Sequence, residues 1–405
     1  MMKMLFVDPA TEIAFNYPNI GLAYAATQLN VKVIDQHTLP YPQDRFLKHK
    51  VDVLGISVRS LTLKEAQRIA RLYKKKYPDV EIVSVRNGID VQCCYPYLDF
   101  KKQVFIDKPF SDAYPFPHYE LFDSFRYLQA CWSSGLWDYT IVTSVGCPYQ
   151  CTFCASHNRK WYPRSAQNCY QELKQAKEKY NIKGFEIIDD CFNLNKERVI
   201  EFANLVARLK LRWECSNGLR ADLFDEETAS AMKISGCELV GFGVESVNPK
   251  VLQIIKKGET LDQIEKAILI AKKYWQKVHG FFIIGLPGAT YEDDLQALEW
   301  ARSRGISAIF SYYVPSAKVV SGESNAFYGE KAHLWSKEYP QELQKKVYQF
   351  SRMKKKKEYL AIGRLGRIVF AVFAMLFHLS PREFPTHFIR VLKKMLSIFL
   401  YGEVQ

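Results

Sequence analysis

The chain has 405 residues, of which 48% are hydrophobic and 24% are charged, a balance typical of globular proteins. This composition argues against a disordered, collagen-like or multi-span membrane protein, and the length allows two or three domains. The formal net charge of +13 is uneven, since residues 341–405 carry 13 Lys and Arg against 4 Asp and Glu. A basic tail on a near-neutral body indicates a local anionic partner and not a protein that binds along DNA.

The first 108 residues predict an α/β domain. Strand-like and helix-like segments alternate along them. The strand-like segments cover 3–8, 31–35, 52–57 and 80–85, and the helix-like segments cover 20–29 and 63–76. Such alternation predicts a doubly wound parallel sheet, whose ligands bind at the carboxyl ends of its strands. No signal peptide is visible at the N-terminus, which favours a cytoplasmic protein without disulfides.

Residues 109–138 begin with an aromatic stretch that holds three prolines and has no clean period, and we interpret them as a linker. A regular alternation resumes over residues 139–320. Its predicted strands cover 139–145, 184–188, 212–216, 239–244, 279–285 and 308–314, and its predicted helices cover 166–180, 196–210, 225–235, 261–274 and 291–304. Strands followed by helices in this order predict a partial (β/α)6 barrel.

Residues 321–405 predict a basic helical extension. Four lysines occupy 354–357, and apolar and basic residues alternate at helical spacing over 388–400. This amphipathic helix fits a peripheral contact with anionic lipid at the inner face of a membrane, or a helical cap on the barrel with a solvated basic rim. The apolar stretch at 368–379 has only 12 residues, whereas a membrane-spanning helix needs about 20.

Three of the ten cysteines form one motif. Cys147, Cys151 and Cys154 stand in the segment GCPYQCTFC, on the loop that follows the first predicted barrel strand. In a barrel this face carries the active site. Three thiolates on one loop can hold three irons of a [4Fe–4S] cluster, and the missing fourth cysteine leaves one iron open to a small molecule. The alternative is a structural zinc ion held by the same cysteines with His157.

The cysteine motif resembles that of radical S-adenosylmethionine (SAM) enzymes, in the branch that carries an N-terminal cobalamin-binding-type domain. The resemblance implies that Cys147, Cys151 and Cys154 hold a [4Fe–4S] cluster whose open iron binds SAM. It implies that an electron from the cluster cleaves SAM to a 5′-deoxyadenosyl radical. It also implies a reductant such as flavodoxin or ferredoxin.

Later segments resemble the SAM contacts of this family. Asp189 or Asp190 stands where a carboxylate meets the methionyl ammonium, and Arg220 resembles a carboxylate-binding position. Glu245 and Ser246 lie in a segment similar to the ribose contact. Gly285 lies in one similar to the adenine side. By themselves the same residue types also fit helix caps, a surface ion pair and a turn.

The N-terminal segments 6–9, 19–24 and 52–57 resemble the cobalamin-binding domains of this branch. The segment that supplies a cobalt-ligating histidine in some relatives is absent after the first strand, and His37 is only a partial echo of it. Asn87 and Gly88 stand where relatives often have Gly-Gly. The domain therefore either binds cobalamin or shapes the substrate pocket without it.

The resemblance implies an enzyme that methylates or otherwise modifies an unactivated carbon of a small-molecule or lipid-like substrate. If cobalamin binds, methyl transfer is the leading reaction, followed by cyclisation or rearrangement. One alternative is a tRNA-modifying enzyme, because methylthiotransferases share the core. The other is a non-catalytic zinc or iron–sulfur scaffold.

Overall fold

The computed structural model describes residues 2–10, 19–36, 43–58, 62–85, 103–104, 111–122, 139–154, 156, 158–215 and 217–313. These residues divide into two compact units, one formed by residues up to 104 together with 114–122, and the other by 111–113 together with 139–313. The predicted extension at 321–405 lies outside the described residues, and the domain boundaries stay predictions.

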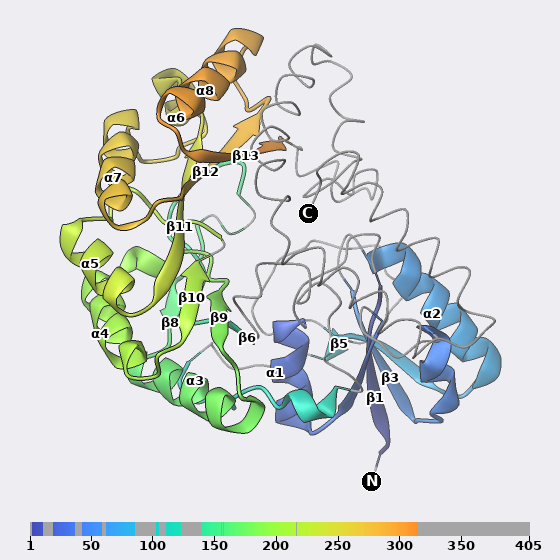
Figure 1. Cartoon of the computed structure of the whole chain (residues 1–405). Coiled ribbons are helices and arrows are strands. Elements are labelled where there is room, and N and C mark those ends of the chain that lie inside the picture. The colour runs from blue at the N-terminus through green and yellow to red at the C-terminus, as the bar shows by residue number, and fades with distance from the viewer. Residues whose placement is uncertain are drawn as a thin grey trace, which may run out of the picture. The chain divides into compact units, whose positions relative to one another are not determined.

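The N-terminal unit is a five-stranded parallel sheet in the order β2-β1-β3-β4-β5 (Figure 1). Its elements are β1 (Met4–Asp8), α1 (Ile20–Leu29), β2 (Lys32–Asp35), the short helix η1 (Gln43–Lys48), β3 (Val53–Ser57), α2 (Leu63–Lys76), β4 (Glu81–Val85) and β5 (Gln103–Val104). The strand order reverses between β1 and β3. The predicted doubly wound sheet is confirmed, and the reversal creates the crevice at which such sheets bind ligands.

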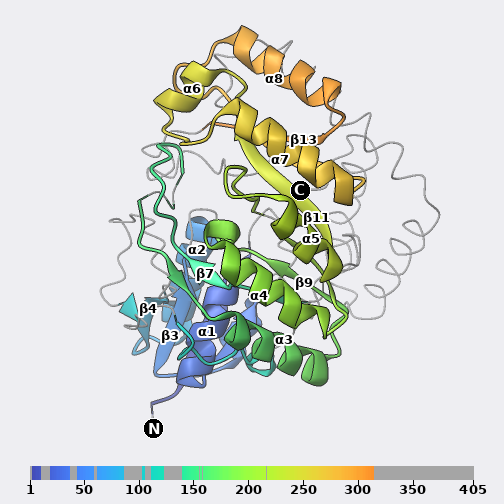
Figure 2. The ribbon, with the colours of Figure 1, turned by 90° about the vertical axis from the view of Figure 1, so that its left-hand side faces the viewer.

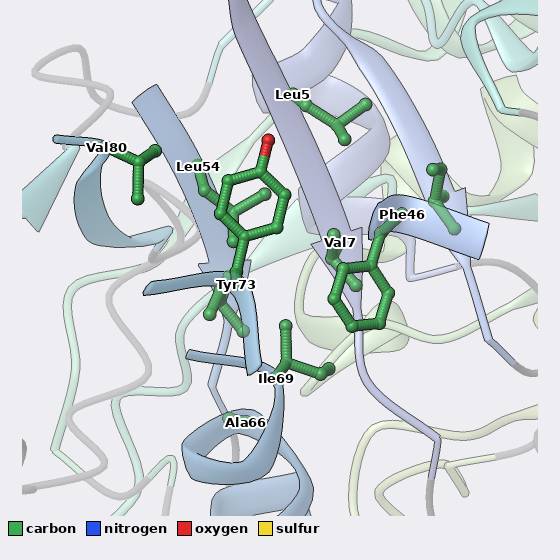
Figure 3. Close-up of a cluster of buried hydrophobic side chains, with 10 residues drawn as sticks. Leu5, Val7, Phe46, Leu54, Ala66, Ile69, Tyr73 and Val80 are labelled. Atoms are coloured by element: carbon green, nitrogen blue, oxygen red, sulfur yellow. The ribbon is translucent and has the colours of Figure 1, made fainter. Parts of the chain in front are cut away.

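One face of this sheet is covered by α2 and η1 (Figure 3). Ala66, Ile69 and Tyr73 of α2 are fully buried, because their spacing places them on one side of the helix. They pack against Leu5 and Leu54 of the two central strands. The helix is therefore held by its apolar face and not by its lysine-rich outer face.

Part of the predicted linker packs on this unit. Tyr114 lies edge-on to Tyr24 of α1, with the ring centroids 5.8 Å apart. Phe122 is buried and forms a parallel bridge with Val33 of β2. The aromatic residues of this stretch thus cover α1 and the edge of the sheet.

The second unit is a six-stranded parallel sheet in the order β13-β12-β11-β10-β9-β6. Its strands are β6 (Tyr139–Ile141), β9 (Gly184–Ile187), β10 (Arg212–Cys215), β11 (Cys237–Glu245), β12 (Val278–Ile284) and β13 (Ser307–Tyr312). The connecting helices are α3 (Ala166–Tyr180), η4 (Phe192–Leu194), α4 (Lys196–Ala207), α5 (Glu226–Ile234), α6 (Pro249–Ile254), α7 (Leu261–Tyr274) and α8 (Tyr291–Ser303). They lie on one side of the sheet, the side that faces the viewer in Figure 2. The predicted partial (β/α)6 barrel is confirmed.

The first barrel strand is shorter than the prediction of 139–145. The sheet strand β6 ends at Ile141, and β7 (Ser144–Val145) pairs antiparallel with β8 (Tyr162–Pro163). The chain leaves the sheet because the carboxylate of Asp189 binds it there, accepting hydrogen bonds from the backbone N–H of Thr143 and from the Ser144 hydroxyl at 2.6 and 2.7 Å. Such a contact between distant residues has no signature in the local sequence.

Candidate functional site

The cysteine motif forms a loop between β7 and β8, here called the cysteine loop (residues 146–160). Gly146 opens it with φ +84°, a left-handed conformation, and a Cβ at this position would lie 2.1 Å from the Lys160 carbonyl oxygen. Only glycine fits there. The Gly146 N–H donates to a carboxylate oxygen of Asp190 at 2.9 Å.

Backbone hydrogen bonds hold the cysteine loop in a compact form. The Arg159 N–H donates to the Cys147 carbonyl at 2.8 Å, and the Cys154 N–H donates to the Cys151 carbonyl at 3.1 Å. The Thr152 N–H donates to the carbonyl of Ile255, which follows α6, at 2.9 Å. The loop is therefore attached to the distant segment 255–259 as well as to the neighbouring strand.

The three motif cysteines are free thiols in different surroundings. A hydrogen bond shared with the buried Cys191 lowers the pKa of Cys147 to about 7, whereas burial raises the pKa of Cys154 to about 11. The Ser156 N–H donates to Cys154 Sγ at 3.4 Å, and Cys151 Sγ lies 3.8 Å from the Lys257 carbonyl. A cysteine near neutral pKa readily supplies the thiolate that binds iron.

The donor set fits an iron–sulfur cluster, because soft thiolates on one loop are its usual ligands. Within the described ranges, no three His, Cys, Asp or Glu side chains converge as ligands of a single metal ion would. A cluster requires no such convergence, since each cysteine binds a different iron. His157, the fourth ligand of the zinc alternative, lies outside the described residues.

Asp189 and Asp190 have different surroundings. Asp189 is 2% exposed and binds the chain between β6 and β7, as described above; burial raises its pKa and the hydrogen bonds oppose that shift. Asp190 is exposed and accepts from Gly146 N–H and from the Ser156 hydroxyl at 2.6 Å. Of these two aspartates, Asp190 is the one that combines contact with the cysteine loop and access to solvent.

Arg220 lies at the carboxyl end of β10 and is 7% exposed. Its guanidinium forms two hydrogen bonds with Asp222, at 2.9 and 3.1 Å, and donates to the Lys257 carbonyl at 3.2 Å. It also stacks on the Tyr149 ring, with Cζ 3.3 Å from the ring centroid. Arg220 therefore connects the cysteine loop to the segment 257–259, and its burial excludes the alternative of a surface ion pair.

Glu245 ends β11 and forms a buried ion pair with Lys257 at 3.1 Å. Lys257 also binds Glu259 at 3.1 Å, and Glu259 accepts a 2.5 Å hydrogen bond from the Ala221 N–H. Burial alone would lower the pKa of Lys257, but the two glutamates raise it above its ordinary value. A Cβ on Gly243 would lie 2.5 Å from a Glu245 oxygen. The glycine thus leaves room for this ion pair.

The two remaining predicted residues form turns beside the strands. The buried Ser246 accepts from the Asn248 N–H at 3.2 Å. Gly285 directly follows β12 with φ 77° and donates its N–H to Asp294 at 3.0 Å. Both positions stand at carboxyl ends of barrel strands, where a SAM contact would have to be, and their roles stay predictions.

Three residues around the cysteine loop were not predicted from the sequence: Cys191, Lys257 and Glu259. Cys191 adjoins the acidic pair in sequence, but only the fold brings it to Cys147. Lys257 and Glu259 follow α6 and reach the site because their segment binds Arg220 and Thr152. A lysine between Lys256 and Gly258 carries no sequence signal of such a contact.

An open depression of about 840 Å³ lies against the outer side of the cysteine loop. Tyr149 and Gln150 line it from the loop, and Lys256 and Asp262 line it from the other side. The depression lies beside the cysteine loop, and none of its lining residues belongs to a strand of the sheet.

The N-terminal sheet has a small polar cluster at its strand-order reversal. The Asn19 amide donates to Asp8 at 3.2 Å and to the Ser57 hydroxyl at 2.8 Å, and all three side chains are buried. His37 and the Asn87-Gly88 pair lie outside the described residues. None of the described helices, in either unit, is long and apolar enough to cross a membrane.

Comparison with known proteins agrees with this arrangement. Residues 141–311 match the radical SAM superfamily. The chain is 28% identical over 369 residues to an uncharacterized methyltransferase of Pyrococcus horikoshii, covering 76% of this chain and 79% of that protein. It is 29% identical over 225 residues to the cytidylyl-2-hydroxyethylphosphonate methyltransferase of Streptomyces wedmorensis, covering 52% of this chain and 42% of that enzyme. The match thus spans less than half of the Streptomyces enzyme.

Among solved structures, the chain is similar to the radical SAM methyltransferase TsrM of Kitasatospora setae with cobalamin and a [4Fe–4S] cluster bound. The TM-score is 0.60 at 16% identity, over 77% of this chain and 72% of that one. This likeness shows a shared fold. Together these relatives favour the radical enzyme over the tRNA-modifying and scaffold alternatives.

Proposed function

We propose that the chain, whose residues 141–311 match the radical SAM superfamily, is a cobalamin-dependent enzyme that methylates an unactivated carbon of a small molecule. The observation that carries the proposal is the position of three free cysteines on one loop at the carboxyl ends of a six-stranded parallel sheet. A radical SAM domain implies a [4Fe–4S] cluster and SAM.

In this proposal Cys147, Cys151 and Cys154 hold the cluster. When bound, the cluster supplies the electron that splits SAM into methionine and a 5′-deoxyadenosyl radical. Gly146 and Asp190 fix the start of the cysteine loop through their 2.9 Å hydrogen bond. The protein would thereby position the cluster, since in cofactor enzymes the protein supplies binding and orientation and the cofactor supplies the chemistry.

Residues at the strand ends would seat SAM. We assign the methionyl ammonium to Asp190 in preference to Asp189, because Asp190 is exposed beside the loop. Glu245 and Ser246 would face the ribose, and Gly285 the adenine. The guanidinium of Arg220 already binds Asp222, so its role here is to hold Tyr149 and the cysteine loop in place.

Two observations support cobalamin and methyl transfer. The N-terminal unit has the doubly wound sheet and the strand-order reversal that bind nucleotide-like ligands. Both curated relatives named above are methyltransferases, and the TsrM structure contains cobalamin. The polar cluster of Asp8, Asn19 and Ser57 marks the crevice where the proposal places the ligand.

The proposed partners are a small-molecule substrate and an electron donor of the flavodoxin or ferredoxin type. The depression lined by Tyr149 and Gln150 adjoins the cysteine loop, and the proposal places the electron donor there. Membrane contact through the basic helix at 388–400 stays a prediction, because that segment lies outside the described residues.

The proposal is tested by purification and reconstitution without oxygen, followed by iron and sulfide analysis and an assay for 5′-deoxyadenosine with dithionite. Wild-type protein should bind about four irons and release 5′-deoxyadenosine, and alanine at Cys147, Cys151 or Cys154 should abolish both. Cys169→Ala, in the buried face of α3, is the matched control and should retain both. Zinc in place of iron, with no product, contradicts the proposal.

Cobalamin is tested separately, by adding hydroxocobalamin during refolding and recording the visible spectrum after gel filtration. A stoichiometric corrinoid spectrum supports the methyltransferase. A protein that forms 5′-deoxyadenosine but retains no corrinoid remains a radical SAM enzyme, and the cobalamin-dependent methyl transfer is then wrong.

A further inference from the structure

Glu245 has an unusual backbone conformation at the end of β11. Its φ of 63° lies in the left-handed region, which residues other than glycine rarely adopt. The pairing of β11 with β12 shifts in register between Gly243 and Glu245, so that β11 advances two residues where β12 advances one. Such irregularities redirect side chains and are common beside active sites. A residue in a rarely populated conformation persists where its surroundings hold it there, and such residues gather at ligand-binding sites.

The side chain of Glu245 lies over Gly243, and Lys257 lies next to it. A Cβ on Gly243 would stand 2.5 Å from Oε1 of Glu245 and 2.8 Å from Nζ of Lys257. The glycine therefore leaves a space on one face of the strand, and the ion pair of Glu245 with Lys257 occupies that space.

Gly243 belongs to the face of the sheet opposite the helices, here called the inner face. Phe281 of β12 is the register partner of Gly243. The next residue, Phe282, packs on Trp300 of α8, with the ring centroids 6.1 Å apart. Because side chains alternate along a strand, Phe281 and position 243 face away from the helices. The ion pair therefore lies at the edge of the inner face, where β11 ends.

Lys257 contacts the cysteine loop and Glu245 through different parts of the residue. Its carbonyl oxygen lies 3.8 Å from Cys151 Sγ and accepts a hydrogen bond from Arg220 at 3.2 Å. Its ammonium group lies 3.1 Å from Glu245 and 3.1 Å from Glu259. One residue thus connects a predicted cluster ligand with the predicted ribose contact.

We propose that Lys257 is a positioning residue, which holds the Glu245 carboxylate toward the ribose hydroxyls of SAM. Lys257 binds Oε1 of Glu245, and among the described residues no group binds the other oxygen, Oε2. A carboxylate oxygen accepts hydrogen bonds from hydroxyls, and these are stronger than bonds between neutral groups. The inference rests on the proposed function, which assigns the ribose to Glu245, and it adds the residue that fixes this contact.

The test compares SAM with an analogue that lacks both ribose hydroxyls, 2′,3′-dideoxy-SAM. The dissociation constants are measured by equilibrium dialysis on the full-length protein with its cluster, and their ratio is the hydroxyl preference. Wild type should bind SAM about tenfold more tightly than the analogue, or better. Lys257→Met and Glu245→Gln should each lower this preference to about threefold or less.

The hydroxyl preference separates a positioning role from a purely structural one. An unfolded fraction weakens the apparent affinity for both ligands by the same factor, so this factor cancels in the ratio. Glu172→Gln is the matched control, because it breaks another buried ion pair, that of Glu172 in α3 with Arg164 at 2.6 Å. It should lower the temperature of unfolding, as Lys257→Met does, and keep the wild-type preference.

An unchanged preference in Lys257→Met overturns the inference. So does a loss of preference in Glu172→Gln, because the effect would then follow from reduced stability alone. If Lys257→Met yields no folded protein, Lys257→Gln takes its place with the same expectation.

The formation of 5′-deoxyadenosine distinguishes this failure from that of the proposed function. A preference that is lost in Glu245→Gln but kept in Lys257→Met shows that only the positioning role is wrong. Wild type that forms 5′-deoxyadenosine without any preference overturns the inference and the ribose contact of Glu245, and the radical chemistry stands. Wild type that shows the preference but never forms 5′-deoxyadenosine keeps the inference and contradicts the radical chemistry.

Discussion

The barrel sheet contains two groups of buried ionisable side chains. One, here called the balanced group, places opposite charges in contact, and the other places two carboxyl groups side by side. At the carboxyl ends of the strands, Lys257 lies between Glu245 and Glu259, so opposite charges are in contact. On the inner face, Glu186 and Glu214 place two groups of the same sign side by side. The first arrangement stabilises the loops that hold the cysteines. In the second, burial raises the pKa of Glu186, and the neighbouring charge of Glu214 adds to that shift.

The largest expected effect comes from breaking the balanced group. Lys257→Met removes the cation and leaves two buried carboxylates facing each other. The free energy of unfolding should fall by about 3–5 kcal/mol, measured by urea denaturation. Lys250→Met, at an exposed position of α6, is the control and should change little. If the free energy of unfolding falls by less than about 1 kcal/mol in Lys257→Met, the ion pairs of Lys257 with Glu245 and Glu259 are exposed to water in solution.

A comparison of neighbouring carboxylates comes next. Asp189→Asn should destabilise the protein by about 2–3 kcal/mol and lower its iron content, because the carboxylate holds the chain before the cysteine loop. Asp190→Asn should leave unfolding nearly unchanged but weaken SAM binding about tenfold, equivalent to about 1.4 kcal/mol. Equilibrium dialysis with SAM measures the second effect. If Asp189→Asn weakens SAM binding and Asp190→Asn mainly destabilises the protein, the ammonium contact belongs to Asp189 instead.

The raised pKa of Glu186 predicts a pH dependence of stability. Burial raises the pKa of Glu186 from the ordinary glutamate value of 4.5 to about 8 in the folded protein. The folded state therefore binds more protons between these values, and stability falls as pH rises from about 4.5 to about 8. Glu186→Gln cannot ionise. Its stability relative to wild type should rise by about 2 kcal/mol from pH 5 to about pH 6.5, as followed by thermal unfolding; a constant difference would contradict the raised pKa.

The smallest expected effect concerns the connection between the balanced group and the cysteine loop. Arg220→Lys keeps the charge but loses the two hydrogen bonds to Asp222 and the stacking on Tyr149. It should cost about 1–2 kcal/mol and accelerate iron loss to a chelator. Arg212→Lys, in an exposed ion pair of β10, serves as its control. If Arg220→Lys and Arg212→Lys lose iron at the same rate, Arg220 does not stabilise the cysteine loop.

The sequence by itself determined the strands, the helices and the position of the cysteines. Alternating apolar segments predicted both parallel sheets, because hydrophobic periodicity is a local property. The spacing of Cys147, Cys151 and Cys154 predicted a cluster motif, because residues close together in sequence on one loop need no tertiary contact to be recognised. The family resemblance predicted an ammonium contact at Asp189 or Asp190 without choosing between them.

Only the tertiary structure decided the surroundings of these residues. The break between β6 and β7, the exposure of Asp190 and the burial of Asp189 depend on contacts over more than forty positions, such as that of Thr143 with Asp189. The Lys257 ion pairs join segments brought together by the sheet, and the glutamate pair depends on the register of β9 against β10. The charges around a buried ionisable group depend on which side chains lie next to it. Side chains far apart in the sequence become neighbours only when the chain folds, so the local sequence cannot predict these contacts.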